Sequence, residues 1–102
     1  MKYNDTDNIK TLYHWVKDEV KKDFVLKNGI ISDEYGFIYL SEKPFRTDKG
    51  YIFLVTIPDN DHLFDWREFW EDNSLGKEYD PTNPYYLYVD QRIPVEYIQL
   101  LK

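Results

Sequence analysis

The sequence predicts an α+β fold, a small domain with a curved, mainly antiparallel sheet and one or two short helices. Its 102 residues fit a single domain. Hydrophobic residues make up 42% and aromatic residues 19% of the chain, which is enough for a packed core. Short segments of strand character outnumber those with helical spacing, and together they give the order β-α-β-β-α-β-β.

Residues 1–10 are polar, and we expect them to form a mobile or weakly attached arm beside a domain over 11–102. This arm has no apolar stretch of the signal-peptide type. No apolar run anywhere approaches the roughly 20 residues of a membrane-spanning helix. We therefore expect a cytoplasmic protein that does not contact a membrane.

The first two elements are an aromatic strand over 11–15 and a helix over about 17–27. Val16, Val20 and Phe24 recur four residues apart, with Val25 beside them, so we expect this stripe to pack the helix on the sheet. The sequence Asn28-Gly29 is typical of a helix end, and Ile30-Ile31 should enter the core.

Four further segments are expected to complete the sheet and add the second helix. The strand over 50–57 is apolar on both faces, which predicts an interior position, and the strand over 36–42 precedes it. The spacing of Leu63, Trp66, Phe69 and Trp70 predicts a short amphipathic helix. The strands at the end are expected over 85–89 and 95–101.

The net charge of −6 is concentrated in one segment. Between Asp59 and Asp80, eight acidic residues stand against Arg67 and Lys77, and the rest of the chain is balanced. Such a segment repels phosphate backbones and attracts basic surfaces. We therefore expect no direct binding to nucleic acid and a possible basic protein partner. The acids expected to face that partner are Asp59, Asp61, Glu68, Glu71 and Asp72.

Several kinds of chemistry are excluded by composition. The chain has no cysteine, so disulfides, thiolate metal sites and cysteine nucleophiles are absent. Only two histidines are present, and the acidic loop from Asp59 lacks the glycine and closing glutamate of an EF-hand, so we expect no metal. P-loop, dinucleotide-binding and zinc-protease motifs are also missing.

A set of short motifs resembles the ADP-ribosyltransferase-like superfamily, in particular its small bacterial and phage members. These motifs are Leu12-Tyr13-His14, the strand Gly36-Phe37-Ile38-Tyr39-Leu40-Ser41, and Tyr88-Val89-Asp90-Gln91-Arg92-Ile93-Pro94-Val95-Glu96-Tyr97-Ile98. The resemblance implies an ADP-ribosyltransferase-like fold that binds NAD. It implies that His14 contacts the ribose, that Tyr39 stacks near nicotinamide, and that Ser41 is a polar neighbour. The alternative for all three residues is a structural role in the sheet.

The catalytic residue stays unknown at this stage. The resemblance places the usual carboxylate where this chain has Tyr85 or Tyr86, and Val16 stands where a serine or threonine is usual. Asp90, Gln91, Glu96 or an acid of the 59–80 segment are alternatives between which the sequence does not choose. We therefore expect weak turnover or none.

Two functions follow as hypotheses. The first is a small ADP-ribosyltransferase-like domain that binds NAD or a related nucleotide. The second is a non-enzymatic acidic protein, of the kind that phages use as inhibitors or anti-defence proteins, that blocks a basic nucleic-acid-binding partner.

Overall fold

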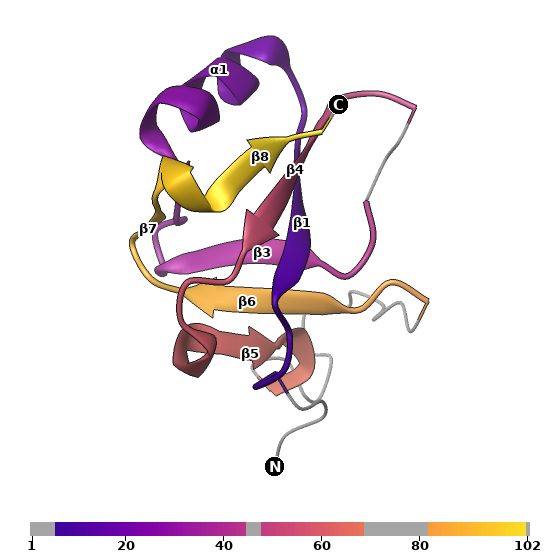
Figure 1. The fold of residues 1–102 in the computed structure, drawn as a ribbon, viewed down its shortest axis with the longest axis vertical. Helices are drawn as coiled ribbons and strands as arrows, with labels where there is room; N and C mark the ends of the chain where they lie inside the picture. Colours follow the sequence, from indigo (N-terminus) through magenta and orange to yellow (C-terminus); the bar gives the residue numbers. More distant parts are fainter. Residues whose placement is uncertain (1–5, 45–47, 69–81, 102) are drawn as a thin grey trace.

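The described part of the chain folds into a six-stranded antiparallel sheet with one α-helix packed beside it (Figure 1). The structure is a computed structural model that describes residues 6–44, 48–68 and 82–101. The described elements are β1 (Thr11–Val16), α1 (Glu19–Asn28), β2 (Ile30–Ile31), β3 (Phe37–Ser41), β4 (Tyr51–Thr56), β5 (Leu63–Asp65), β6 (Tyr85–Val89), β7 (Arg92–Ile93) and β8 (Ile98–Leu100), with 3-10 turns at Asn60–His62, Trp66–Glu68 and Val95–Tyr97.

The strand order in the large sheet is β5-β6-β3-β1-β4-β8, and β2 pairs with β7 in a separate two-stranded ribbon. All of these pairs are antiparallel. The α+β class, the interior position of β4 and the closing strand β8 are therefore as the sequence predicted. Figure 1 shows β1 and β4 crossing β3 and β6 at a steep angle, so the sheet is strongly twisted.

The core lies on the sheet face toward α1. Register pairs Leu12 with Val55 and His14 with Phe53, which places these side chains on that face. Phe53 and Val55 are fully buried, and Leu12 is nearly so. Ile38 and its cross-strand partner Tyr88 continue the same layer. Because strand side chains alternate, the intervening residues must occupy the opposite face.

The opposite face carries many of the aromatic side chains. Tyr13 pairs with Ser41, and Ser41 pairs in turn with Tyr85, so the three share this face. Leu87, the cross-strand partner of Tyr39, is also on this face and is fully buried. Because both faces of the sheet are largely apolar, β4 lacks the alternation of apolar and polar side chains that a half-exposed strand shows.

The expected packing of the apolar stripe is confirmed for Val16, which is buried in the core at the end of β1, but it is wrong for the two helix residues Val20 and Phe24. Val20 is 79% and Phe24 51% exposed, and Val25 is the buried residue of α1. Both ends of the helix fix its rotation: Asp18 caps its start by accepting from the Lys21 amide, and Gly29 ends it against the Ile93 carbonyl. A Cβ at position 29 would overlap that carbonyl, so only glycine allows this approach.

The two isoleucines after the helix have different environments. Ile30 is buried, as expected, but Ile31 is 49% exposed, so only the first enters the core. In a strand as short as β2, adjacent side chains point to opposite faces, and α1 leaves one of those faces open.

The prediction of an amphipathic helix after residue 62 is also wrong for residues 63–68, the part of it that the structure describes. Leu63–Asp65 forms strand β5, which pairs with β6, and a 3-10 turn follows at Trp66–Glu68. Asp65 is fully buried, and its carboxylate forms two hydrogen bonds with the Arg67 guanidinium, at 3.1 and 3.2 Å. Strand pairing and this ion pair therefore override the helical spacing. Phe69 and Trp70 lie outside the described residues.

The segment before β1 is attached more firmly than we expected, from residue 6 onward. Thr6 is fully buried and its hydroxyl donates to the Leu63 carbonyl at 3.1 Å. The Asn60 amide donates to the carbonyls of Thr6 and Ile9, both at 2.7 Å. Residues 1–5 of the expected arm lie outside the described part of the chain.

Candidate functional site

A local separation of β1 and β3 creates the candidate site. The two strands are in register at Tyr13 and Ser41. Beyond this pair, Nδ1 of His14 lies 3.0 Å from the Tyr39 carbonyl oxygen of β3. The His14 side chain thus takes the place of a backbone hydrogen bond from β1. The imidazole therefore sits between two strands that are no longer paired at this point.

An aromatic hollow of about 310 Å³ opens at this separation. It brings together the three residues that the sequence selected, and four aromatic rings supply most of its wall. The lining residues are Tyr13, His14, Trp15, Tyr39, Leu40, Ser41 and Tyr85. No carboxylate, lysine or arginine of the described residues lines this hollow. The surface is therefore apolar and aromatic, with the imidazole as its main polar group.

The protonation state of His14 follows from its surroundings. Burial lowers the pKa of His14 below its ordinary value, and the hydrogen bond to the Tyr39 carbonyl opposes this effect only in part. The ring is therefore neutral near pH 7. A carbonyl oxygen only accepts, so the proton must be on Nδ1, and Nε2 keeps a lone pair that can accept a hydrogen bond.

Tyr39 presents its ring rather than its hydroxyl. The hydroxyl donates to the Asp33 carboxylate at 2.8 Å, while the ring lies 6.1 Å from that of Trp66. Desolvation, together with the hydrogen bond and negative charge of Asp33, raises the pKa of Tyr39 to about 12. Burial alone would raise the pKa of Asp33, but hydrogen bonds from the Phe37 amide, the Tyr39 hydroxyl and the Tyr35 amide lower it. Asp33 thus holds the ring in place.

The hydroxyl of Ser41 is also already used. It donates to the Lys43 carbonyl at 2.6 Å, and the residue is buried. Ser41 therefore shapes the wall of the hollow, and its oxygen can only accept from a ligand. Of the three residues selected from the sequence, His14 supplies a ring nitrogen, Nε2, that can accept a hydrogen bond from a ligand while Nδ1 keeps its bond to Tyr39.

Sequence reasoning missed the other aromatic members of the site. Trp15 is held by a hydrogen bond from its indole to the Lys49 carbonyl at 2.9 Å, and its ring lies against Gly50. Tyr85 contacts the ring of Trp66 edge to face, with centroids 6.3 Å apart. The alternation of Tyr13 and Trp15 along β1 was a signal that both face the same side, but their partners on β3 and β6 come from the fold.

The carboxylates considered as catalytic residues, Asp90 and Glu96, lie outside the aromatic hollow. Tyr85 lines the hollow, whereas Tyr86 points into the core. Asp90 caps the turn after β6, where its carboxylate accepts from the Gln91 amide at 2.7 Å. Glu96 lies in the exposed 3-10 turn before β8. The hollow therefore contains none of these carboxylates.

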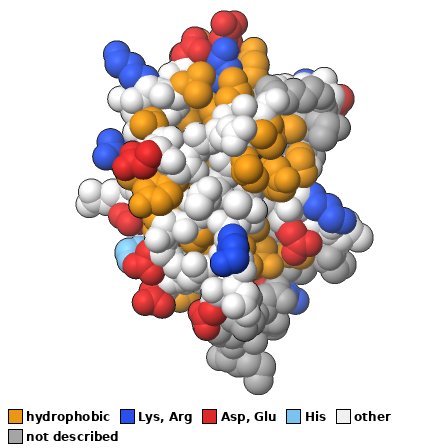
Figure 2. Space-filling model, in the orientation of Figure 1, with side chains coloured by type: hydrophobic (Ala, Val, Ile, Leu, Met, Phe, Trp, Pro, Cys, Tyr) orange, Lys and Arg blue, Asp and Glu red, His pale blue; other side chains and the backbone are white. Residues whose placement is uncertain are grey.

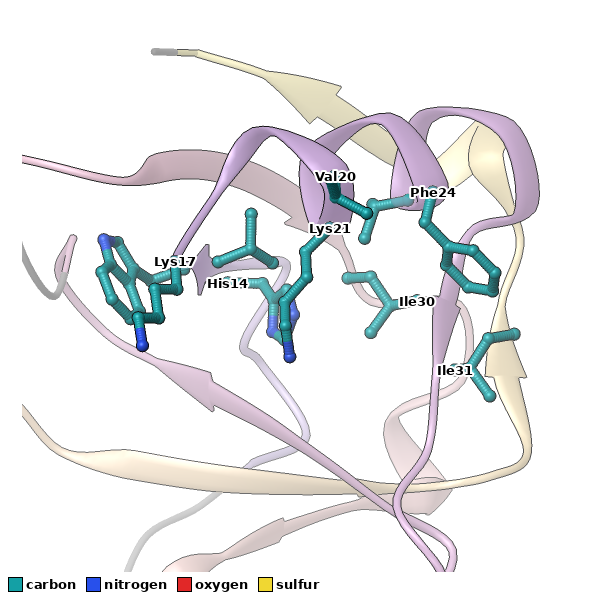
Figure 3. Close-up of a pocket in the computed structure, with 10 residues that line it drawn as sticks. His14, Lys17, Val20, Lys21, Phe24, Ile30 and Ile31 are labelled. Carbon is teal, nitrogen blue, oxygen red and sulfur yellow. The ribbon is translucent and has the colours of Figure 1, made fainter.

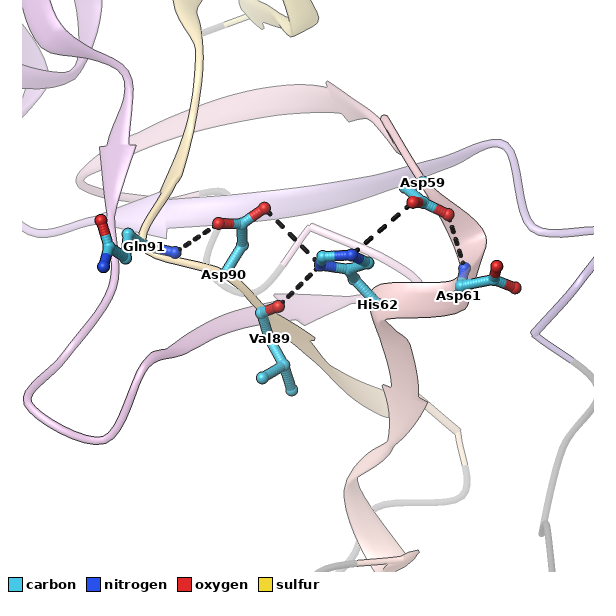
Figure 4. A network of polar contacts seen from close by, with 6 residues as sticks. All are labelled: Asp59, Asp61, His62, Val89, Asp90 and Gln91. Carbon is cyan, nitrogen blue, oxygen red and sulfur yellow. Dashed lines mark hydrogen bonds and ion pairs between the residues drawn. The ribbon is translucent and has the colours of Figure 1, made fainter.

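The acidic residues form part of a second polar cluster, around His62 (Figure 4). The His62 ring stacks on Tyr88 and its Nδ1 lies 2.9 Å from the Val89 carbonyl oxygen. Carboxylate oxygens of Asp59 and Asp90 lie 3.6 Å from its two ring nitrogens. The second carboxylate oxygen of Asp59 caps the following turn. This cluster therefore has a clear structural role in joining two loops.

Of the acids expected to bind a partner, Asp59 and Asp61 are exposed on this part of the surface. Glu71, Asp72 and the side chain of Glu68 lie outside the described residues. Figure 2 shows acidic side chains along the left and lower parts of the face in view, between separate hydrophobic patches.

No group of three or more potential metal ligands occurs among the described residues. Within the same residues, no helix is long and apolar enough to cross a bilayer. No protein-family model, curated protein or solved structure significantly matches the chain, so its resemblance to ADP-ribosyltransferase-like proteins stays a prediction.

Proposed function

We propose that the protein is a binding module whose aromatic hollow takes a flat, nitrogen-containing ring, the nicotinamide end of NAD or of a related nucleotide. The observation that carries this proposal is that four aromatic rings and the neutral imidazole of His14 line one hollow. Aromatic walls favour flat ligands because offset stacking adds to the burial of apolar area.

The chemistry of the lining favours nicotinamide over other parts of the nucleotide. The nicotinamide ring of oxidised NAD is positively charged, and a cation is attracted to aromatic faces. Its carboxamide N–H can donate to Nε2 of His14, which forms no hydrogen bond with another described residue. The described lining has no basic side chain to neutralise a phosphate, so the diphosphate should remain outside the hollow.

We propose little or no turnover. Cleavage of the nicotinamide–ribose bond passes through an oxocarbenium-like state, which enzymes stabilise with a nearby carboxylate. The described lining supplies none, and Tyr85 stands near the position where the resemblance implies one. Binding without chemistry is therefore the reading that the side chains favour.

Thermal denaturation with three ligands tests this proposal. NAD and nicotinamide mononucleotide should raise Tm, and ADP-ribose, which lacks the nicotinamide ring, should not. Tyr85→Leu should abolish the shift, and Tyr35→Leu is the matched control because Tyr35 is 71% exposed and outside the hollow. Equal stabilisation by ADP-ribose, or no response to any of the three, would contradict the proposal.

A second candidate function is that of an acidic protein that binds and blocks a basic partner. It is favoured by the concentration of the whole net charge between residues 59 and 80, and by the exposure of Asp59 and Asp61. The same hollow offers aromatic faces to an arginine side chain. Opposite charge would speed the encounter and an aromatic anchor would provide affinity.

An arginine-rich peptide tests this second function. Its affinity should fall between about 50 and about 300 mM salt, because added salt screens exposed charges. Asp61→Lys should weaken binding more than the control Glu42→Lys, which reverses an exposed charge away from this cluster. If the two variants behave alike, the acids serve solubility only.

A further inference from the structure

A second and larger hollow lies between α1 and the strands beneath it (Figure 3). Its volume is about 530 Å³, in the range of small-molecule sites. Apolar side chains and two lysines supply most of its wall. The lining residues are His14, Trp15, Val16, Lys17, Val20, Lys21, Phe24, Val25, Ile30 and Ile31. We call this feature the helix groove.

The helix groove has a charged end and an apolar end. Figure 3 shows Lys17 at one end, Lys21 crossing the view of His14 in the middle, and Phe24 and Ile31 at the other end. Phe24 is 51% and Ile31 49% exposed, and Val20 between the two ends is 79% exposed. Large apolar side chains gathered around one concave surface are typical of a binding site, whereas isolated ones need no explanation.

Two lysines belong to the helix groove, Lys17 just before α1 and Lys21 within it. Lys22, one residue further on, pairs with Asp23 at 3.3 Å and lies 5.0 Å above the Tyr51 ring. Lys17 and Lys21 form no such contact with a described side chain, and no acidic residue lines the groove. Lys17 and Lys21 therefore bring two ammonium groups without an anionic partner among the described residues to an apolar groove, in a protein of net charge −6.

We propose that the helix groove binds a small amphiphilic carboxylate, with its carboxylate between Lys17 and Lys21 and its apolar body along Phe24 and Ile31. An apolar chain of about ten carbons fits a hollow of this size. Binding removes the exposed parts of the apolar side chains from water, which is the main driving force. The lysines fix the direction of the ligand, because only a carboxylate at their end pairs with them.

This site goes beyond the proposed function and is separate from it in its chemistry. The aromatic hollow is lined by stacking surfaces without a cation, whereas the helix groove has aliphatic side chains and two lysines. The two share His14 and Trp15, so the test avoids variants of these residues.

Three ligands with the same ten-carbon chain test the proposal, each titrated into the full-length protein by calorimetry below its micelle concentration. Decanoate should bind, decanol should bind about tenfold more weakly, and decyltrimethylammonium should be weaker still because the lysines repel it. Equal affinity for all three would overturn the proposal, since it would show a non-specific apolar surface.

Variants of the groove separate its charged end from its apolar end. Lys17→Glu with Lys21→Glu should weaken decanoate binding by about tenfold and strengthen binding of decyltrimethylammonium. Lys27→Glu is the matched control, because it reverses an exposed charge on the same helix outside the groove. Phe24→Ser should weaken all three ligands. If Lys27→Glu has the same effect as the double variant, the net charge and not the groove determines binding.

A variant of the aromatic hollow makes the two proposals distinguishable. Tyr85→Leu should remove the response to NAD and leave decanoate binding unchanged, because Tyr85 does not line the helix groove. Loss of decanoate binding in this variant would contradict the separate groove, whatever the outcome for NAD.

Discussion

Replacing Phe24 by alanine tests how α1 is attached to the sheet. The repeat of apolar residues four apart suggests a buried Phe24, whose loss would cost about 3–5 kcal/mol. In the structure the residue is 51% exposed, and Val25 makes the helix contact with the core. The two arrangements therefore predict very different losses of stability.

The expected loss follows from the exposed fraction. Full burial of a phenylalanine side chain contributes about 1.5–3 kcal/mol, so burial of about half contributes about 1 kcal/mol. Alanine has a higher helix propensity than phenylalanine, which offsets about 0.5 kcal/mol of this loss of stability. We therefore expect Phe24→Ala to lower the free energy of unfolding by about 0.5 kcal/mol. Phe53→Ala is the comparison, because Phe53 is 0% exposed and should cost about 3–5 kcal/mol.

Thermal and urea denaturation followed by circular dichroism measure both variants. For a domain of this size, 1 kcal/mol corresponds to about 4–8 °C in Tm. Phe24→Ala should lower Tm by about 2–4 °C, and Phe53→Ala by more than about 12 °C. A loss for Phe24→Ala as large as that for Phe53→Ala would refute the described orientation of α1, and with it the helix groove.

Three further variants test the ion pair, the aromatic hollow and the buried histidine. Asp65→Asn removes the partner of the Arg67 guanidinium and should cost about 3 kcal/mol by urea denaturation, toward the low end for a buried pair because Arg67 is 30% exposed. Gly50→Ala should destabilise by more than about 1 kcal/mol and change tryptophan fluorescence, since φ is +78° and an added Cβ would overlap the Trp15 indole. Burial lowers the pKa of His14, so the folded state binds fewer protons than the unfolded state, and the free energy of unfolding should fall as the pH drops below about 6.5. His14→Gln should reduce this pH dependence. Urea denaturation between about pH 5 and 8 measures it.

The sequence was sufficient for most of the sheet. The strands around Phe53 and Leu87 are apolar or aromatic runs that follow a glycine or a proline, and the strand around Leu12 is a run of aromatic and β-branched residues. Such runs have few other ways to bury their side chains. The interior position of β4 followed from its two apolar faces. The end of α1 followed from Gly29, since few other residues adopt its positive φ.

The candidate site was predictable only in part. The selection of His14, Tyr39 and Ser41 rested on a family resemblance, and the structure brings all three to one hollow. The hydroxyl of Ser41 donates to the Lys43 carbonyl, which reduces the polar role expected for it, whereas the hydrogen bond from Tyr39 to Asp33 leaves the ring of Tyr39 able to stack. No sequence pattern predicts these two hydrogen bonds, because each depends on the backbone conformation of the turns before and after β3.

The amino-acid sequence by itself determined the fold class, most of the strands and the concentration of negative charge, because these depend on local propensity and composition. Strand β5 is the exception, because its pairing with β6 overrides a helical spacing. Only the tertiary structure decided which face of α1 is buried and where β1 separates from β3. Helical spacing fixes which residues share a face, but the rotation of a short helix depends on what its ends contact, here Asp18 and the Ile93 carbonyl. That rotation exposes Val20 and Phe24, and the separation of the strands places His14 among aromatic rings.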